Sequence, residues 1–406
     1  MPLHSNLVIG LKKVHVKQII EQASTGRIEV HAKAKGRRIC KHCGSRRVQS
    51  RGWRTRTLKH ARQGRRLIEI HLKLRKFRCR ACLRSGVEQV PHVLPRKRST
   101  ENFRQEVFEL HQGGLTQSHL SKTHSISCST VERWLWDFLG ARLKELKDRS
   151  CPKILGIDEH FFTRKKGYAT TLVDLGRKHK VFDVVLGRSE KSLEGYLRAL
   201  KEKSRVQVVV MDLSASYRAL IRRHFPNAMI VADRFHVVRL IQQQFQKLWG
   251  QLDPRARKNR GLLSLFRRHR GNMTSLQHER LEAYLRSVPG LQAIDQVQQR
   301  LLELVRLKGL HRNHARRLIP ELLGIIEKLK QSGFELMQTL GNTLDEWLQE
   351  IGRMWRFRKT NSITEGFHNK MEMLSRRAFG FRNFQNYRIR VLALCGWDGL
   401  FTRIDL

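Results

Sequence analysis

The spacing of hydrophobic and polar positions changes along the chain and predicts two kinds of segment in its first third. Residues 65–79 (RRLIEIHLKLRKFRC) alternate apolar and polar side chains, a pattern typical of a strand. Residues 101–139 instead carry apolar positions at helical spacing, with breaks at Gly113-Gly114 and at 125–128 (SISC). We therefore expect a strand and, after it, three helices.

Helix-capping residues set the expected starts of the first and third of these helices. Ser99 or Thr100 stands where the first helix should begin, and Ser129 with Glu132 matches a capping box for the third. A capping hydroxyl accepts a backbone N–H that the first turn leaves unpaired. The third helix should therefore start near Ser129.

From Lys153 the pattern changes to short apolar segments. Five strands are expected, at 154–162, 167–175, 179–187, 206–212 and 228–233. Helices are expected between the later strands, at 189–203 and 214–225. Three strands in a meander followed by strand–helix alternation predict a mixed α/β sheet. Beyond it, residues 235–355 predict helices, and 360–397 predict a helix, a turn at Gly380 and another helix.

The charge of the chain indicates a polyanionic partner. Its 406 residues include 81 Lys and Arg against 35 Asp and Glu, a net charge of +46, and a hydrophobic content of 40% is enough for folded cores. Self-repulsion on this scale is costly without a polyanion, so we expect a nucleic acid. No run of about 18 apolar residues occurs and the N-terminus lacks the pattern of a secretion signal, so no membrane partner is expected.

Four of the seven cysteines form two C-x-x-C pairs: Cys40, Cys43, Cys79 and Cys82. Two such pairs, brought together by a hairpin, make a tetrahedral sulfur site that suits one structural Zn²⁺. The alternative is four unrelated buried cysteines, which the paired spacing disfavours. The hairpin would present a row of arginines to DNA, namely Arg46, Arg47, Arg51, Arg54 and Arg56.

The three helices at 101–139 resemble a helix-turn-helix. Its recognition helix would present Thr130, Glu132 and Arg133 to the major groove. The alternative is an ordinary three-helix packing unit without a role in binding.

Two isolated acids, Asp158 and Asp212, stand at or near the ends of apolar strands. Functional groups gather at the carboxyl ends of strands in α/β sheets, so these carboxylates converge if their strands are neighbours. Two adjacent carboxylates repel unless a cation lies between them, and Mg²⁺ prefers oxygen ligands. Glu159 should point to the other face of its strand, which favours Asp158. The alternative is that both aspartates belong to turns or caps.

A third carboxylate would complete such a site, and Glu365 in NSITEGFHNK is the candidate. The alternative for Glu365 is a capping box with Ser362. Asp233 and His236, three residues apart, would share one helical face as an accessory pair. Asp233 could equally be an N-cap with His236 in the first turn.

Taken together, these blocks resemble the ISL-three family of bacterial insertion-sequence transposases of the DDE type, over nearly the whole chain. The resemblance is carried by CKHC and CRAC, the helix-turn-helix, ILGIDEHFFTRKKGYATTLVDL, VVVMDLSASYRALIRRHFPNAMIVADRFHVV and TNSITEGFHNKMEMLSRRAFGFRNFQNYRIRVL. Family members often read SN..EG where this chain reads NSITEG. The resemblance implies that Asp158, Asp212 and Glu365 are the catalytic triad, with Asp233 and His236 matching the C/D-x-x-H signature.

The resemblance also implies a fold and an activity. The expected parts are a zinc-binding domain at 1–98, a helix-turn-helix at 99–150, an RNase H-like core at 151–236 and 356–406, and an all-helical insertion at 237–355. The implied activity is cleavage and strand transfer of double-stranded DNA at terminal inverted repeats. Two Mg²⁺ ions would serve this reaction, in a homodimer or higher oligomer in the bacterial cytoplasm. The rivals are a non-catalytic zinc-dependent DNA-binding regulator and a Mg²⁺-dependent nuclease that does not join strands.

Overall fold

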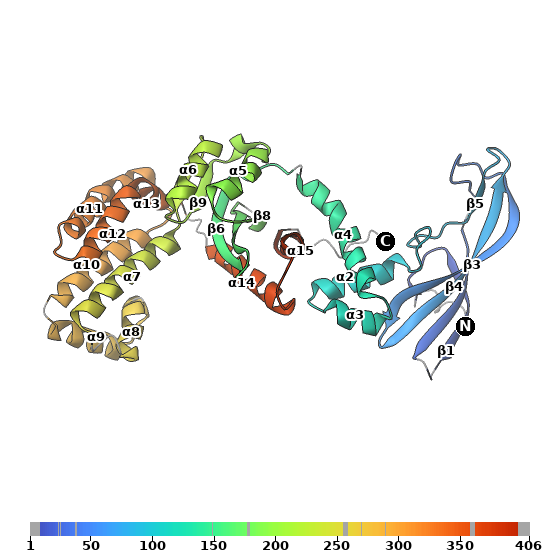
Figure 1. Cartoon of the computed structure of the whole chain (residues 1–406), viewed down its shortest axis with the longest axis horizontal. Helices are drawn as coiled ribbons and strands as arrows, with labels where there is room; N and C mark the ends of the chain where they lie inside the picture. The colour runs from blue at the N-terminus through green and yellow to red at the C-terminus, as the bar shows by residue number, and fades with distance from the viewer. Residues whose placement is uncertain are drawn as a thin grey trace. The chain divides into compact units, whose positions relative to one another are not determined.

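The computed structural model describes residues 9–396, apart from 23, 25, 37–38, 148, 177–178, 255–258, 269, 289 and 358–361. The chain divides into two compact units, and the boundary falls between Lys144 and Glu145 (Figure 1). Because each unit has its own core, each is described by itself.

A mixed β-sheet forms the first part of the N-terminal unit. Its strands are β1 (Val14–Gln22), β2 (Arg27–Ala34), β3 (Val48–Gln63), β4 (Arg66–Cys79) and β5 (Ser85–Val87). The order is β1-β2-β4-β3 with β5 on β4, and only β2 and β4 run parallel. Strand β4 confirms the strand predicted at 65–79. Buried residues alternate along β2 and β4, so one face of the sheet forms the core, with Val30, Ile70 and Leu72 at its centre.

Three helices follow the sheet, as the helical spacing predicted: α2 (Glu101–Gln112), α3 (Gln117–His124) and α4 (Cys128–Lys147). Thr100 caps α2 by accepting the backbone N–H of Phe103 at 3.3 Å. The third helix starts near Ser129 as predicted, but the capping box predicted for Ser129 and Glu132 is wrong. Helix α4 begins at Cys128 because the Ser127 hydroxyl, one position before it, accepts the backbone N–H of Thr130 at 3.2 Å.

A second mixed sheet organises the other unit. Its strands are β6 (Ile154–Thr163), β7 (Gly167–Asp174), β8 (Lys180–Leu186), β9 (Val208–Met211) and β10 (Met229–Ala232). The order is β10-β9-β6-β7-β8, in which β10, β9 and β6 run parallel and β6, β7 and β8 form an antiparallel meander. Helices α5 (Glu190–Ala199) and α6 (Ala215–His224) connect the later strands. All five predicted strands and both predicted helices are confirmed.

Helices alone make up the described part of the chain between β10 and the C-terminal segment, apart from one short 3-10 turn. They are α7 (Arg234–Leu252), α8 (Arg260–Arg267), α9 (Ser275–Ser287), α10 (Leu291–Arg306), α11 (Arg312–Lys330), α12 (Glu335–Glu346) and α13 (Leu348–Met354). This confirms the helical character predicted for 235–355. None of the described helices is long and apolar enough to span a membrane.

Arg234 ties this helical region to the sheet at the start of α7. Its guanidinium is buried and donates hydrogen bonds to the carbonyls of Val305, Leu307 and Met354 at 3.1, 3.0 and 2.7 Å. These carbonyls lie at the ends of α10 and α13, where a helix leaves its last carbonyls without partners. The Arg234 side chain therefore caps the C-terminal ends of two helices that are distant in the sequence.

The C-terminal segment returns to the second sheet as two helices, α14 (Ser362–Arg377) and α15 (Phe384–Val391), with the predicted turn at Gly380 between them. Figure 1 shows α14 beside β6, against which it packs, and α15 packs on β8. An ion pair fixes the second contact. The Arg388 guanidinium donates to both carboxylate oxygens of Asp183 at 2.7 Å, and the Tyr196 hydroxyl donates to the same carboxylate at 3.0 Å.

The Asp183–Arg388 pair yields a stability prediction. Asp183→Ala removes one partner of a largely buried pair and leaves the guanidinium without its acceptor. We expect a loss of about 3 kcal/mol in the unfolding free energy of the second unit. Arg382→Met, at an exposed position on the neighbouring turn, should change it by less than about 0.5 kcal/mol. Urea unfolding of the full chain measures both, and equal effects of the two substitutions would contradict the assignment.

Candidate functional site

Three aspartates lie at the same level on or just after three neighbouring parallel strands. Strands β6 and β9 pair Gly156 with Val210, and two residues further along each strand lie Asp158 and Asp212. Strands β10 and β9 pair Ala232 with Met211, so Asp233 falls level with Asp212. The sheet register therefore brings the three aspartates to one level: Asp212 and Asp233 directly follow their strands, and Asp158 lies within β6, just past its parallel pairing with β9.

His236 lies at the centre of this group. Its Nε2 atom is 4.0 Å from Asp158 Oδ1 and 3.7 Å from Asp233 Oδ2. Asp233 also caps α7 by accepting the backbone N–H of Phe235 at 3.4 Å. Both readings of this pair from the sequence therefore hold together: Asp233 is an N-cap, and it shares a helical face with His236.

Asp158 is buried and Asp212 is partly buried, and no Lys or Arg of the described residues forms an ion pair with either carboxylate. Burial, with repulsion from Asp212 and Asp233, raises the pKa of Asp158 to about 7, against the attraction of His236. Burial also raises the pKa of Asp212, whose Oδ1 atom is buried and has no hydrogen-bond partner among the described residues. A hard cation with oxygen ligands, such as Mg²⁺, fits this donor set and would relieve the repulsion.

Glu365 stands apart from these aspartates. It is exposed on the first turn of α14, and the described contact from this helix to the site is made by His368, whose Nδ1 atom is 3.9 Å from Asp158 Oδ2. Residues three apart share one side of a helix, so Glu365 lies one turn from this contact. The side chain of Ser362, its predicted capping partner, lies outside the described residues.

Closely spaced donor atoms among the described residues occur in two other places. The four paired cysteines form one group, and Glu29, His31 and His71 form another on the first sheet, each with its donor atoms within 4.8 Å of one another. Asp158, Asp212 and Glu365 do not form a third group at this spacing. The structure therefore brings Asp158, Asp212, Asp233 and His236 to one edge and leaves the Glu365 carboxylate outside.

A set of polar residues behind Asp158 was missed by the sequence analysis. His368 Nε2 is 3.0 Å from the Thr171 hydroxyl, which is 2.9 Å from His160 Nδ1, and His160 Nε2 is 2.8 Å from the Tyr387 hydroxyl. Burial lowers the pKa of His160 to about 3 and that of His368 to about 4, so both rings are neutral. A signal existed, because His160 is two residues after Asp158 and shares its face of the strand.

The four paired cysteines have the geometry of a zinc site. The Sγ atoms of Cys40 and Cys82 are 3.6 Å apart, and so are those of Cys43 and Cys79. Zn–S bonds of about 2.3 Å in a tetrahedron separate neighbouring sulfurs by about 3.8 Å. Gly44 has a φ of +70°, a left-handed conformation that glycine adopts easily, and it turns the chain directly after the Cys40–Cys43 pair. The residues present therefore fit one structural Zn²⁺.

Backbone N–H groups favour the thiolate form at this site. Hydrogen bonding from the backbone of Cys82 lowers the pKa of Cys79 to about 6. Hydrogen bonding from the backbone of His42 likewise lowers the pKa of Cys40. The thiolate is the form that binds zinc, so the local backbone prepares the site for the metal.

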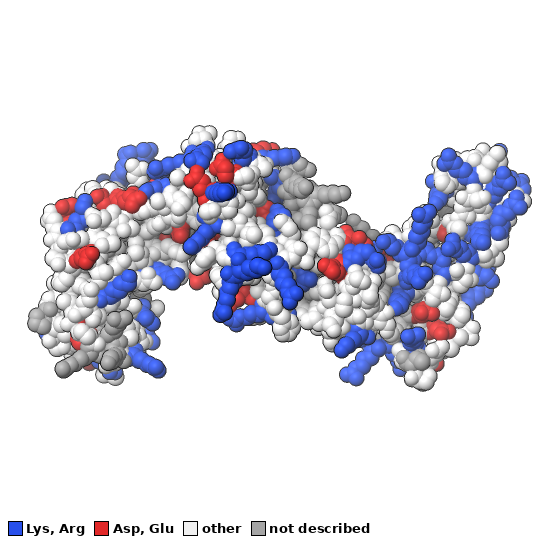
Figure 2. Space-filling view, viewed as in Figure 1, with Lys and Arg blue, Asp and Glu red and all other residues white. Residues whose placement is uncertain are grey.

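Most of the predicted DNA-contacting arginines lie on an exposed basic surface around this site. The exposed members are Arg46, Arg47, Arg51 and Arg54. Figure 2 shows Lys and Arg covering the surface around β3 and β5. Arg56 is half-buried, and its guanidinium donates to the carbonyls of Lys97 and, at 3.0 Å, Leu94. It therefore holds the segment before α2 against β3.

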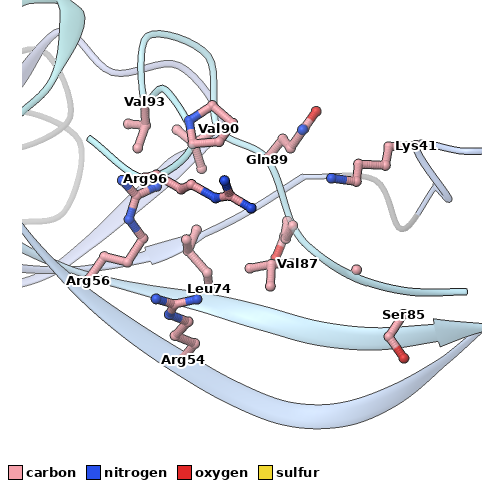
Figure 3. A pocket seen from close by; sticks show the side chains of 13 residues that line it. Lys41, Arg54, Arg56, Leu74, Ser85, Val87, Gln89, Val90, Val93 and Arg96 are labelled. Atoms are coloured by element: carbon pink, nitrogen blue, oxygen red, sulfur yellow. The ribbon is translucent and has the colours of Figure 1, made fainter. Parts of the chain in front are cut away.

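Two basic cavities lie in the N-terminal unit. One, of ≈ 310 Å³, is lined by cations from three segments, and Figure 3 shows Arg54, Arg56 and Arg96 at one end and Lys41 at the other. The second, of ≈ 590 Å³, lies at the start of α4. Its lining includes Lys59, Arg98, Thr130 and Arg133, and the last two are residues predicted to face DNA.

Loss of one zinc ligand should release the metal and loosen only the tip of the hairpin. Cys40, Cys79 and Phe77 form a small core of their own, separate from the core of the sheet. We expect Cys79→Ser to reduce bound zinc from one ion per chain to almost none and to raise hydrogen exchange at the tip. Cys128→Ser, at an exposed unpaired cysteine, should retain zinc. Equal zinc content by elemental analysis would argue against a four-cysteine site.

Removal of the Asp158 charge should stabilise the protein without divalent metal, and more so at higher pH. The native state keeps a proton on Asp158 up to about pH 7, whereas the unfolded chain releases it near 3.8. The contribution of Asp158 to the unfolding free energy is therefore fully present below about pH 3.8 and is lost as the pH rises to about 7. The advantage of Asp158→Asn should grow by on the order of 2 kcal/mol between pH 5 and pH 8. Parallel stability profiles in urea would refute this.

Comparisons with known proteins match both units. A profile for transposases of the ISL3 type matches residues 155–391, and a profile for the zinc finger of transposases IS204/IS1001/IS1096/IS1165 matches residues 36–82. The transposase for insertion sequence element IS1001 of Bordetella parapertussis is 26% identical over 375 residues, which cover 87% of this chain and 88% of that protein.

The matched regions contain the features built up above. The first includes the carboxylate edge, the helical region and α14, and the second includes the four paired cysteines. The transposase profile alone spans more than half of the chain. The protein therefore belongs to the ISL3 family of insertion-sequence transposases.

Proposed function

We propose that this protein is an active DNA transposase whose second unit is an RNase H-like catalytic core interrupted by a helical insertion. Support comes from the mixed sheet, in which the meander β6-β7-β8 joins parallel β9 and β10, and from the helices that separate β10 from α14. The observation that carries the proposal is the alignment of Asp158 and Asp212 at one sheet edge, with a buried oxygen of Asp212 that has no partner.

The protein's own residues would hold the metal and orient the reaction. Asp158, Asp212 and Glu365 are the proposed ligands, and Glu365 would have to turn inward from its exposed position on α14. Two Mg²⁺ ions held there would activate water or a 3′-hydroxyl and stabilise the leaving oxygen of a phosphodiester. Asp233 fixes the start of α7, and this places His236 beside Asp158 as the accessory group.

The N-terminal unit would bind the terminal inverted repeats of the element as double-stranded DNA. We propose that Arg46, Arg47, Arg51 and Arg54 contact the phosphate backbone from the zinc hairpin, with Arg56 holding the adjacent loop. The helices α2, α3 and α4 would act as a helix-turn-helix, with Thr130 and Arg133 facing DNA at the basic cavity of α4. The reaction needs two DNA ends, so a dimer or higher oligomer in the bacterial cytoplasm completes the proposal.

A DNA-binding regulator without catalysis is the rival reading. It accounts for the zinc site, the three helices and the positive charge. It gives no reason for a chain with a net charge of +46 to gather Asp158, Asp212 and Asp233 at the same end of a sheet, with Asp158 and Asp233 buried. A regulator would also keep its function in Asp158→Asn.

The decisive test is DNA cleavage by Glu365→Gln. Gln is close to Glu in size and preserves a helix cap, but it lacks the charge that binds Mg²⁺. We expect this variant to bind a plasmid carrying the gene's own flanking DNA and to cut it at least about 100-fold more slowly than wild type. Glu372→Gln provides the matched control, because Glu372 is exposed on the same helix and pairs only locally with Arg376.

Each outcome assigns the role of Glu365 or removes it. Cleavage by wild type and Glu372→Gln, but not by Glu365→Gln, supports the triad. Equal cleavage by all three would leave Glu365 as a capping residue only. Cleavage without joined products would favour a nuclease, and tight binding by all three without cleavage would favour the regulator.

A further inference from the structure

The polar residues behind Asp158 form a continuous hydrogen-bonded chain. Thr171 lies at its centre, completely buried, with His368 Nε2 at 3.0 Å and His160 Nδ1 at 2.9 Å from its hydroxyl oxygen. The far end of the chain is the buried Tyr387 hydroxyl, 2.8 Å from His160 Nε2. The near end is His368 Nδ1, 3.9 Å from Asp158 Oδ2.

The donors and acceptors of this chain allow one arrangement when Asp158 is ionised. The Nδ1 atom of His368 is 3.9 Å from Asp158 Oδ2, beyond direct hydrogen-bond distance, and the negative charge favours a protonated Nδ1 facing it, which leaves Nε2 as an acceptor. The Thr171 hydroxyl then donates its one hydrogen to His368 and accepts from His160 Nδ1–H. His160 Nε2 in turn accepts the hydroxyl hydrogen of Tyr387, which completes the hydrogen bonds that link His368, Thr171, His160 and Tyr387.

The chain joins parts of the sequence that local folding does not bring together. Thr171 and His368 are 197 positions apart, and His160 and Tyr387 are 227 positions apart. His160 and Thr171 belong to the meander β6–β7, whereas His368 and Tyr387 belong to α14 and α15. The two histidine rings also pack on each other, with centroids 5.0 Å apart. The four side chains therefore set where the C-terminal helices dock against Asp158.

We propose that His368 is a positioning residue for the metal site. Its ring holds the Asp158 carboxylate in one orientation, and the hydrogen-bonded chain through Thr171 and His160 to Tyr387 fixes the ring. The inference rests on the proposed function, in which Asp158 binds Mg²⁺. Groups that orient a metal ligand in this way affect metal affinity without touching the ion.

The experiment measures Mn²⁺ binding to the zinc-loaded full-length protein by electron paramagnetic resonance, which needs no DNA and no turnover. His368→Leu keeps the bulk of the ring and removes both nitrogens, and we expect about tenfold weaker Mn²⁺ binding. His368→Asn places an amide N–H near the position of Nδ1 and should restore affinity to within about threefold of wild type. His278→Leu, at an exposed histidine on α9, is the matched control and should bind as wild type.

Two substitutions further along the chain separate positioning from simple packing. Thr171→Val keeps the shape and removes the central hydroxyl, and Tyr387→Phe removes the terminal hydroxyl alone. If the chain fixes the ring, both weaken Mn²⁺ binding, with the larger loss in Thr171→Val, because it breaks the link next to His368. A packing role would lower thermal stability in these variants without a change in Mn²⁺ affinity.

Asp158→Asn separates failure of this inference from failure of the proposed function. Loss of Mn²⁺ binding in Asp158→Asn and in His368→Leu, with recovery in His368→Asn, supports the proposal. Loss in Asp158→Asn with wild-type affinity in His368→Leu overturns the positioning role alone. Should His368→Leu fail to fold, Thr171→Val takes its place, and wild-type affinity there overturns the inference equally. Unchanged Mn²⁺ affinity in Asp158→Asn would overturn both the proposed metal site and the inference that rests on it.

Discussion

The parallel register of three strands is the constraint on which the second unit depends. Because β10, β9 and β6 run side by side in the same direction, the residues just past their paired segments reach one edge at one level. Aspartates at those positions are forced together whatever the rest of the chain does. Burial and mutual repulsion disfavour the ionised form of these carboxylates, and the cation of the proposed function would relieve that repulsion.

The distribution of positive charge differs between the zinc hairpin and the carboxylate edge. In a chain that carries +46, cations crowd the zinc hairpin and the start of α4, whereas the ring nitrogens of His236 and His368 lie beside Asp158. An arginine at either histidine position would neutralise the carboxylates permanently and compete with a metal ion. Histidine side chains fill the same space without a permanent positive charge.

Local patterns in the sequence predicted the elements, and long-range contacts decided the site. The five strands of the second sheet and the start of α2 followed from apolar runs and one capping hydroxyl. Strands β1 and β2 were not predicted: adjacent Ile19 and Ile20 interrupt the alternation of β1, whereas the alternation of β2 was a signal that was missed. The partnership of Asp158 with Asp212 could be expected from strand ends. The link from Thr171 to His368 could not, since no local rule relates residues 197 positions apart.

Arg234 links the helical region to the carboxylate edge. Its guanidinium grips the last carbonyls of α10 and α13 while its backbone sits directly beside Asp233. A chain shortened by removal of the helices between β10 and α14 would lose the carbonyl acceptors of this buried guanidinium, directly beside the residue that caps α7. The cost of an unpaired buried cation would then fall on the turn that carries Asp233 and His236.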